Sequence, residues 1–212
     1  SRLVVDNNNT GIMELMIRVG RIQLYIIFAI FSVIVLFGKT FINLWVGDKF
    51  ADVYYIVICL TFAHLLGNTF QIAVDKAYAD DKIKHLTRVT FTTSLIGIVF
   101  SCMFAKQFGA VGCAICSGIA LLLTQICYLQ VFKKRLDINM SQFLSKCHLR
   151  ILPILVPFVV PFYFIYNYID SNSWFGLIAM IGIYIVCYII VVYTVLLNDY
   201  EKTILSSIIK QK

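Results

Sequence analysis

The sequence predicts an all-helical membrane protein, and three observations support this fold class. First, 60% of the 212 residues are hydrophobic and only 14% are charged, whereas soluble domains are about 45–50% apolar and about 25% charged. Second, the apolar residues gather into six runs, and each is long enough for a helix that crosses a bilayer. Third, 18 residues are Lys or Arg, and all except Lys39, Lys49 and Lys106 fall in or directly beside every second connection between the runs or at the two chain ends.

The apolar runs should be helices because the hydrocarbon core of a membrane offers backbone N–H and C=O groups no partners. A closed barrel would need apolar and polar residues in alternation, which these runs lack. We expect six membrane-spanning helices, whose ranges in chain order are 22–46, 53–74, 89–105, 109–132, 149–169 and 174–197.

Each helix has a distinguishing feature. The first has a weak point at Gly38 and Lys39, and the second carries most of the polar residues found in these runs. The third and fourth are joined only by residues 106–108, so we expect them to form a tight hairpin. The fifth holds all three prolines, and the sixth begins at Trp174. Trp174 and Trp45 should both lie at the outer membrane interface, where tryptophan is enriched.

The basic connections predict the orientation. Positive charge concentrates on the cytoplasmic side of membrane proteins, so both termini should be cytoplasmic. The net charge of +7 is then explained by basic cytoplasmic loops and does not indicate a surface for nucleic acid. The expected parts are an amphipathic lead-in at 1–21, spanning helices at 22–132, a basic loop at 133–148, spanning helices at 149–197 and a tail at 198–212.

The second expected helix carries the strongest candidate site. Thr61, His64, Asn68, Gln71 and Asp75 recur at intervals of three and four residues, which places them on one helical face. Asp75 follows the expected end of this helix, so the alternative position for it is beyond the membrane, at the cytoplasmic end. Polar residues inside a membrane helix are costly and tend to face a bundle interior or a water-filled cavity. One interpretation is the polar wall of a transport path, in which His64 could titrate near neutral pH. The other is a row of hydrogen bonds that holds this helix to its neighbours.

The fifth expected helix holds Pro153, Pro157 and Pro161 at intervals of four. Each proline removes one backbone donor and clashes with the carbonyl group four residues earlier. The helix should therefore be kinked, either as a fixed bend or as a hinge of the kind found in transporters.

Two arginines, Arg18 and Arg21, precede the first expected helix. Guanidinium groups pair well with phosphate oxygens, so these residues could contact a diphosphate. The alternative is ordinary contact with anionic lipid headgroups at the membrane surface.

No motif predicts catalysis, a metal or a cofactor. The chain lacks a nucleophile elbow, a Walker loop and an HExxH sequence, and we expect it not to be an enzyme. It has seven Cys. Cys113 and Cys116 lack the further ligands that a zinc site requires, so packing is the better interpretation of both.

Several short motifs resemble the C-terminal part of the polysaccharide flippases, a family of the multidrug, oligosaccharidyl-lipid and polysaccharide exporter superfamily. Residues 37–47 read FGKTFINLWVG, and residues 108–114 read FGAVGCA; both are similar to family motifs. The tail at 199–201 is similar to the exit from the family's last helix. Two positions depart from the pattern: residues 79–82 read ADDK where a Gly-Lys pair is common, and Lys106-Gln107 stands where a proline often precedes Phe-Gly.

The resemblance implies a two-lobed helical bundle, of which this chain would be most of the second lobe. Since the chain begins with Ser1 and not Met, we expect an N-terminal lobe to be missing. The implied function is to flip a lipid-linked oligosaccharide, on an undecaprenyl-diphosphate carrier, across the inner membrane for surface polysaccharide such as O-antigen. The implied mechanism is alternating access, with membrane lipids and the missing lobe as partners. Two alternatives remain open: a multidrug or small-molecule exporter of the same superfamily, and a polytopic membrane enzyme such as a sugar polymerase.

Overall fold

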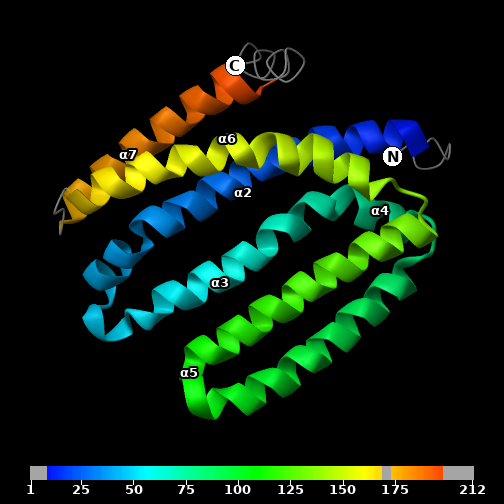
Figure 1. Ribbon diagram of the computed structural model, residues 1–212, viewed down its shortest axis with the longest axis horizontal. Helices are drawn as coiled ribbons and strands as arrows, with labels where there is room; N and C mark the ends of the chain where they lie inside the picture. Colours follow the sequence, from blue (N-terminus) through cyan, green and yellow to red (C-terminus); the bar gives the residue numbers. More distant parts are fainter. Residues whose placement is uncertain (1–8, 169–172, 198–212) are drawn as a thin grey trace.

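The computed structural model describes residues 9–168 and 173–197, and every regular element in these ranges is a helix (Figure 1). The long helices are α2 (Asn9–Trp45), α3 (Asp52–Gly67), α4 (Gln71–Ala79), α5 (Ile83–Arg135), α6 (Met140–Tyr168) and α7 (Trp174–Val191). The short elements are the 3-10 turns η1 (Asp48–Phe50) and η2 (Asn68–Phe70) and the π-helical turn η3 (Val192–Leu196).

Five helical stretches of the described chain are long and apolar enough to cross a membrane: Gly11–Trp45, Asp52–Ala79, Ile83–Arg135, Met140–Tyr166 and Trp174–Leu196. These stretches confirm an all-helical, multi-pass membrane fold.

The number of stretches differs from the six that we expected, because the third and fourth expected helices are joined within α5. Gly109 interrupts α5 with φ 56° and ψ −144°, a backbone conformation that glycine adopts without steric cost. The chain reverses there, and the two halves of α5 lie side by side (Figure 1). The expected hairpin is present, but residues 106–108 are helical and do not form a separate loop; the chain turns at Gly109.

Two boundaries also differ from expectation. The described part of the lead-in, from Asn9 onward, belongs to the same continuous helix as the first span. The expected basic loop at 133–148 is reduced to residues 136–139, because α5 continues to Arg135 and α6 begins at Met140. The turn contains Asp137 with φ 54°, a left-handed conformation that Asp tolerates better than most residues.

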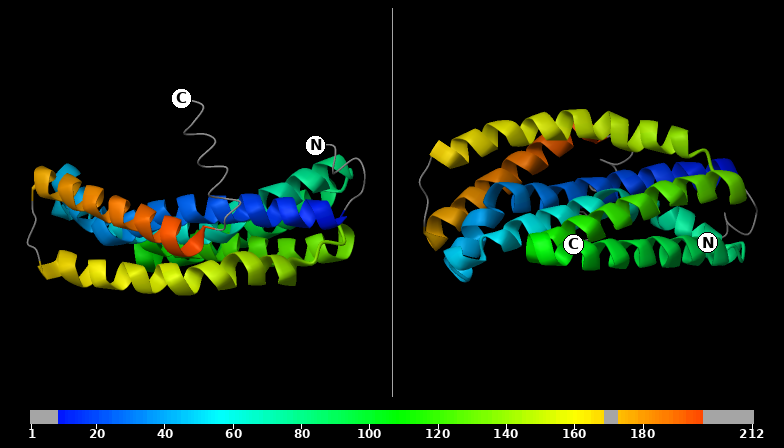
Figure 2. Two further views of the ribbon diagram at one scale, coloured as in Figure 1. Left: turned by 90° about the horizontal axis from the view of Figure 1, so that it is seen from above. Right: turned by 60° about the horizontal axis from the view of Figure 1, so that its bottom comes forward.

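The bundle is built around α2, which contacts α3, α4, α6 and α7. Phe37 of α2 meets Tyr166 of α6 and Tyr184 of α7 with ring centroids 4.8 and 6.0 Å apart. Figure 2 shows α6 as a bowed helix without a sharp break. Residues far apart in the sequence therefore form the aromatic core.

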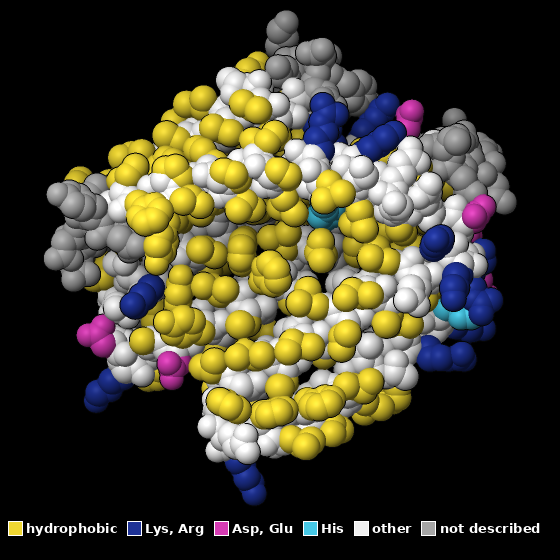
Figure 3. Space-filling view, viewed as in Figure 1, with side chains coloured by type: hydrophobic (Ala, Val, Ile, Leu, Met, Phe, Trp, Pro, Cys, Tyr) yellow, Lys and Arg dark blue, Asp and Glu magenta, His cyan; other side chains and the backbone are white. Residues whose placement is uncertain are grey.

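Charge is distributed unevenly between the two ends of the bundle. In Figure 3, Lys and Arg side chains gather mainly toward the end where Figure 1 places the α4–α5 and α5–α6 turns. Apolar side chains cover most of the visible surface between the ends. We call this the basic end; it includes Lys133, Lys134 and Arg135 in the last turn of α5.

Candidate functional site: a polar face on α3, η2 and α4

The structure brings the predicted polar residues of α3, η2 and α4 to one side of the bundle and exposes them. His64, Asn68, Gln71 and Asp75 are exposed, and Thr61 is half-buried. The opposite side of the same segment packs into the bundle through buried residues, namely Ala63, Leu65, Thr69, Phe70, Ala73, Lys76 and Ala77. We call the exposed group, residues 61, 64, 68, 71 and 75, the polar face.

Hydrogen bonds of the polar face stay within its own segment in the described structure. Thr61 Oγ1 donates to the Val57 carbonyl oxygen at 2.7 Å, and Gln71 Nε2 donates to Asp75 Oδ1 at 3.1 Å. These bonds do not join helices. The imidazole and amide groups of His64 and Asn68 are directed away from the core and are accessible to whatever covers this side.

The polar face crosses an unexpected break in the helix. The sequence predicted one continuous helix over 53–74, whereas α3 ends at Gly67 and a 3-10 turn at η2 precedes α4. Thr69 Oγ1 donates to the Leu66 carbonyl oxygen at 2.7 Å inside this turn. A Cβ atom at Gly67 would meet the side-chain amide of Gln125 from α5, so the Gln125 side chain lies directly beside the break. A 3-10 stretch within a helix often marks a hinge, and here it lies at the centre of the polar face.

His148 supports the break from α6, a role that sequence reasoning missed. Its side chain is 4% exposed, and Nε2 lies 3.3 Å from Thr69 Oγ1. Because the Thr69 hydroxyl donates to Leu66, we assign the hydrogen of this contact to Nε2. The sequence signal was available: Phe143, Cys147, Ile151 and Leu155 are spaced by four and fully buried, so helical periodicity extends into the segment that we expected to be a loop.

The two predicted arginines occupy different environments. Arg18 is exposed and forms an ion pair with Glu14 at 3.3 Å. Arg21 is 4% exposed, and its Nη2 donates to the Leu196 carbonyl oxygen at 2.8 Å and to Tyr25 Oη at 2.9 Å. A cation at the C-terminal end of a helix is favoured by the helix dipole. Arg21 therefore attaches the end of η3 to α2, and Arg18 is the arginine with an accessible guanidinium.

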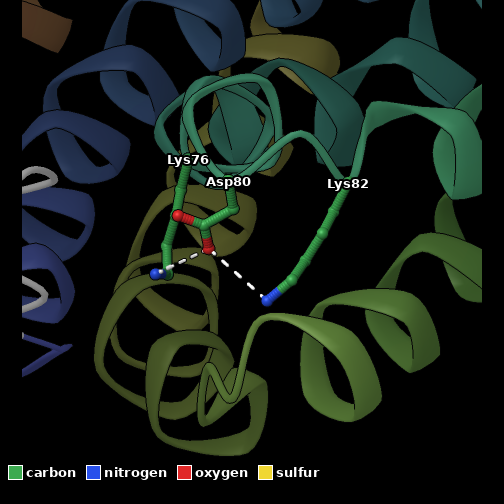
Figure 4. Close-up of polar contacts among 3 residues, drawn as sticks. All are labelled: Lys76, Asp80 and Lys82. Atoms are coloured by element: carbon green, nitrogen blue, oxygen red, sulfur yellow. Dashed lines mark hydrogen bonds and ion pairs between the residues drawn. The ribbon is translucent and has the colours of Figure 1, made fainter.

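A second charged cluster holds the α4–α5 turn (Figure 4). Lys76 is only 2% exposed, and its Nζ lies 3.1 Å from Asp80 Oδ2. Lys82 Nζ lies 3.7 Å from the same oxygen. A buried lysine needs a charged or hydrogen-bonding partner, so Asp80 has a structural role that its position in a charged loop did not predict.

The three prolines lie within α6, and all are exposed. They occupy one side of the helix, opposite the buried residues Ile151 and Leu155. The helix remains continuous through them, so a fixed bend agrees with the observed shape, and the hinge stays a prediction.

The cysteines make no metal site in the described part of the chain, where no group of three or more His, Cys, Asp or Glu side chains comes together. Cys113 Sγ donates to the Ser101 carbonyl oxygen at 3.7 Å across the two halves of α5. This contact agrees with the packing interpretation of Cys113.

No family model, curated protein or solved structure matches this chain. The functional conclusion therefore depends on the geometry of the polar face, together with the motifs in the sequence.

Proposed function

We propose that this chain forms one wall of a path along which a polar molecule crosses a membrane. The observation that carries the proposal is the exposed polar face on Asp52–Ala79, a stretch of membrane-spanning hydropathy. Exposed imidazole and amide groups at membrane depth cost free energy if they face lipid. This cost is avoided when water or a second helical lobe covers them, and the space between the two lobes is then polar.

The chemistry of the polar face suits a substrate rich in hydroxyl groups. His64, Asn68, Gln71 and Thr61 offer neutral donors and acceptors, and Asp75 supplies the single carboxylate at the α4 end. With the motif resemblance, this composition favours a lipid-linked oligosaccharide on an undecaprenyl-diphosphate carrier. We propose that the sugars move along the polar face while the lipid tail stays in the bilayer, and that the exposed Arg18 contacts the diphosphate.

Alternating access would require the two lobes to rock around the path. The η2 break gives the polar face a place to bend, and the prolines of α6 lie in the helix that contacts η2 through His148. The basic end supports an orientation with this end and both termini in the cytoplasm. The proposed location is the inner membrane of a cell that makes surface polysaccharide.

The test uses cells that lack the full-length gene product. We expect undecaprenyl-linked oligosaccharide to accumulate in the inner leaflet and surface polysaccharide to be lost. Complementation with the unsubstituted protein should restore both, whereas Asn68→Leu and His64→Leu should restore neither fully, because each removes hydrogen-bonding groups from the path. Phe62→Leu is the matched control, since Phe62 is an exposed apolar residue of the same helix.

Each outcome has a distinct meaning. Normal surface polysaccharide without inner-leaflet accumulation would contradict the flippase and favour an exporter of small molecules. Full complementation by Asn68→Leu and His64→Leu would show that the substrate does not use the polar face. Comparable membrane levels of each variant, measured by immunoblot, are needed for the comparison.

A further inference from the structure

A cavity of about 300 Å³ opens between η2, the second half of α5 and the start of α6. Gln125 and His148 take part in its lining, but His148 Nδ1 is buried and Nε2 is directed to Thr69. The rest of the wall is apolar and consists of Leu66, Phe70, Ile126, Leu129, Leu144 and Leu149. All three walls belong to stretches with membrane-spanning hydropathy. The cavity is therefore suited to hydrocarbon, and its shape is made by side chains of three separate helical segments.

The cavity lies near the basic end of the bundle. Lys133 is four residues beyond Leu129 in α5, so it lies on the cavity-lining face, about one helical turn closer to the end. Lys133 is exposed and has no ion pair within the described residues. Lys134 and Arg135 complete a run of three exposed cations at the end of α5. A positive charge thus lies where the headgroup of a lipid would be if its chain entered the cavity.

From this arrangement we infer that the cavity binds one acyl chain of an anionic phospholipid, whose phosphate is held by Lys133. An acyl chain fits the apolar walls, and a lysine beside the membrane surface attracts an anionic headgroup. The site is separate from the polar face, so this inference holds whatever substrate the path carries. It makes the α5–α6 junction a specific lipid site, in contrast to the first half of α5, whose large apolar residues such as Phe91, Ile98 and Met103 are exposed and do not line this cavity.

Fluorescence quenching by brominated lipids tests the site on the full chain in phosphatidylcholine vesicles. The two native tryptophans, Trp45 and Trp174, are replaced by Phe, and Ile126→Trp places a single reporter at the cavity. Ile126 is 52% exposed, so a larger ring fits at its edge. Phe91→Trp is the matched reporter, because Phe91 is exposed and lies at a similar distance from the basic end in the other half of α5.

We expect brominated phosphatidylglycerol to quench the Ile126→Trp reporter at about five-fold lower content than brominated phosphatidylcholine, the factor that one lysine near an anionic surface provides. Arg88 lies three residues before Phe91 and is also exposed, but Phe91 does not line the cavity, so the preference at position 91 should be smaller. Adding Lys133→Gln should lower the preference at position 126 to the level at position 91, whereas Arg88→Gln should leave the preference at position 126 unchanged. A preference at position 126 no greater than that at position 91, or one that Lys133→Gln leaves unchanged, would overturn the inference. Circular dichroism checks that every variant keeps its helical content.

Discussion

Two regions of the molecule solve the problem of holding helices together in lipid in different ways. The first is the aromatic core of α2, α6 and α7, where Tyr184 is fully buried and its ring lies 5.0–6.1 Å from those of Phe37, Phe158, Phe162 and Tyr188. Large interlocking rings fill the space between these helices. The contacts join residues from the beginning and the end of the chain, so this region fixes the overall topology.

The second region is the α5 hairpin, which associates through small residues and hydroxyl groups. A Cβ atom at Gly97 would lie 2.7 Å from Cβ of Ala120, and the Oγ1 atoms of Thr93 and Thr124 are 2.7 Å apart. Small residues let helices approach closely in membranes, where lipid tails weaken the hydrophobic driving force between helices. The stability of the hairpin therefore depends on close contacts between a few small groups, whereas that of the aromatic core depends on the space filled by large side chains.

The segment with the polar face lies between these two regions. Its buried side contacts α2 and the second half of α5, and these contacts turn the polar face outward. Substitutions in the two regions should lower the free energy of unfolding by different amounts. Only a substitution in the hairpin should be repaired by a second one.

The largest effect is expected for Tyr184→Ala in the aromatic core. Removal of a fully buried ring leaves a cavity between three helices and should lower the free energy of unfolding by about 3–5 kcal/mol. The measurement is unfolding in mixed detergent and dodecyl sulfate micelles, followed by circular dichroism. Tyr184→Phe keeps the ring and should remain close to the unsubstituted protein. A loss below 1 kcal/mol for Tyr184→Ala would mean that the ring cluster is not the main link between α2 and α7.

The second effect concerns the polar attachment of η3, which continues α7, to α2. Arg21→Met removes a charged donor from the Leu196 carbonyl oxygen and should cost about 1.5–3 kcal/mol, the range for hydrogen bonds that involve a charged group. The same micelle titration measures it. Arg18→Met is the control, since the exposed pair of Arg18 with Glu14 should contribute less than about 1 kcal/mol. Equal losses for the two variants would contradict the distinction between a buried and an exposed arginine.

The third effect tests close approach in the hairpin. Gly97→Ala inserts a methyl group against Ala120 and should destabilise the protein by roughly 1–3 kcal/mol through overpacking. Adding Ala120→Gly removes the opposing methyl group, so the double variant should recover most of the loss. Such repair has no counterpart at Tyr184. An additive loss in the double variant would show that the two positions do not touch in the membrane.

The same comparison explains what the sequence could predict. Helical fold class, the positions of the apolar stretches and the reversal near Gly109 follow from local composition, because a short link between two long apolar runs leaves few alternatives. The polar face was also predictable, since it depends only on helical spacing within one segment. The exposure of the polar face could not be predicted, because it depends on which helices pack against the segment.

The missed features all arise from contacts between distant residues. His148 supports Thr69 across 79 positions of sequence, and Arg21 reaches Leu196 across 175. Neither residue has a local pattern that identifies its partner, so both contacts were missed. The assignment of His148 to a loop was avoidable, because the spacing of Phe143, Cys147 and Ile151 already indicated a helix there. The break at η2 was also missed; the side-chain amide of Gln125 from α5 lies beside Gly67 at this point, and this neighbour is 58 positions away in the sequence.

The smallest effect is expected for the hydroxyl pair of the hairpin. Thr93→Val removes the contact with Thr124 Oγ1, but the Thr124 hydroxyl keeps the Ala120 carbonyl oxygen as an acceptor at 2.8 Å, so no buried group is left without a partner. The expected loss is about 0.6 kcal/mol, the average for such bonds in a membrane protein. A double-mutant cycle with Thr124→Val isolates the coupling. Coupling above about 2 kcal/mol would mean that hydroxyl pairs, and not close packing of small residues, hold the hairpin together. The two regions would then differ because one is held by polar contacts and the other by aromatic contacts.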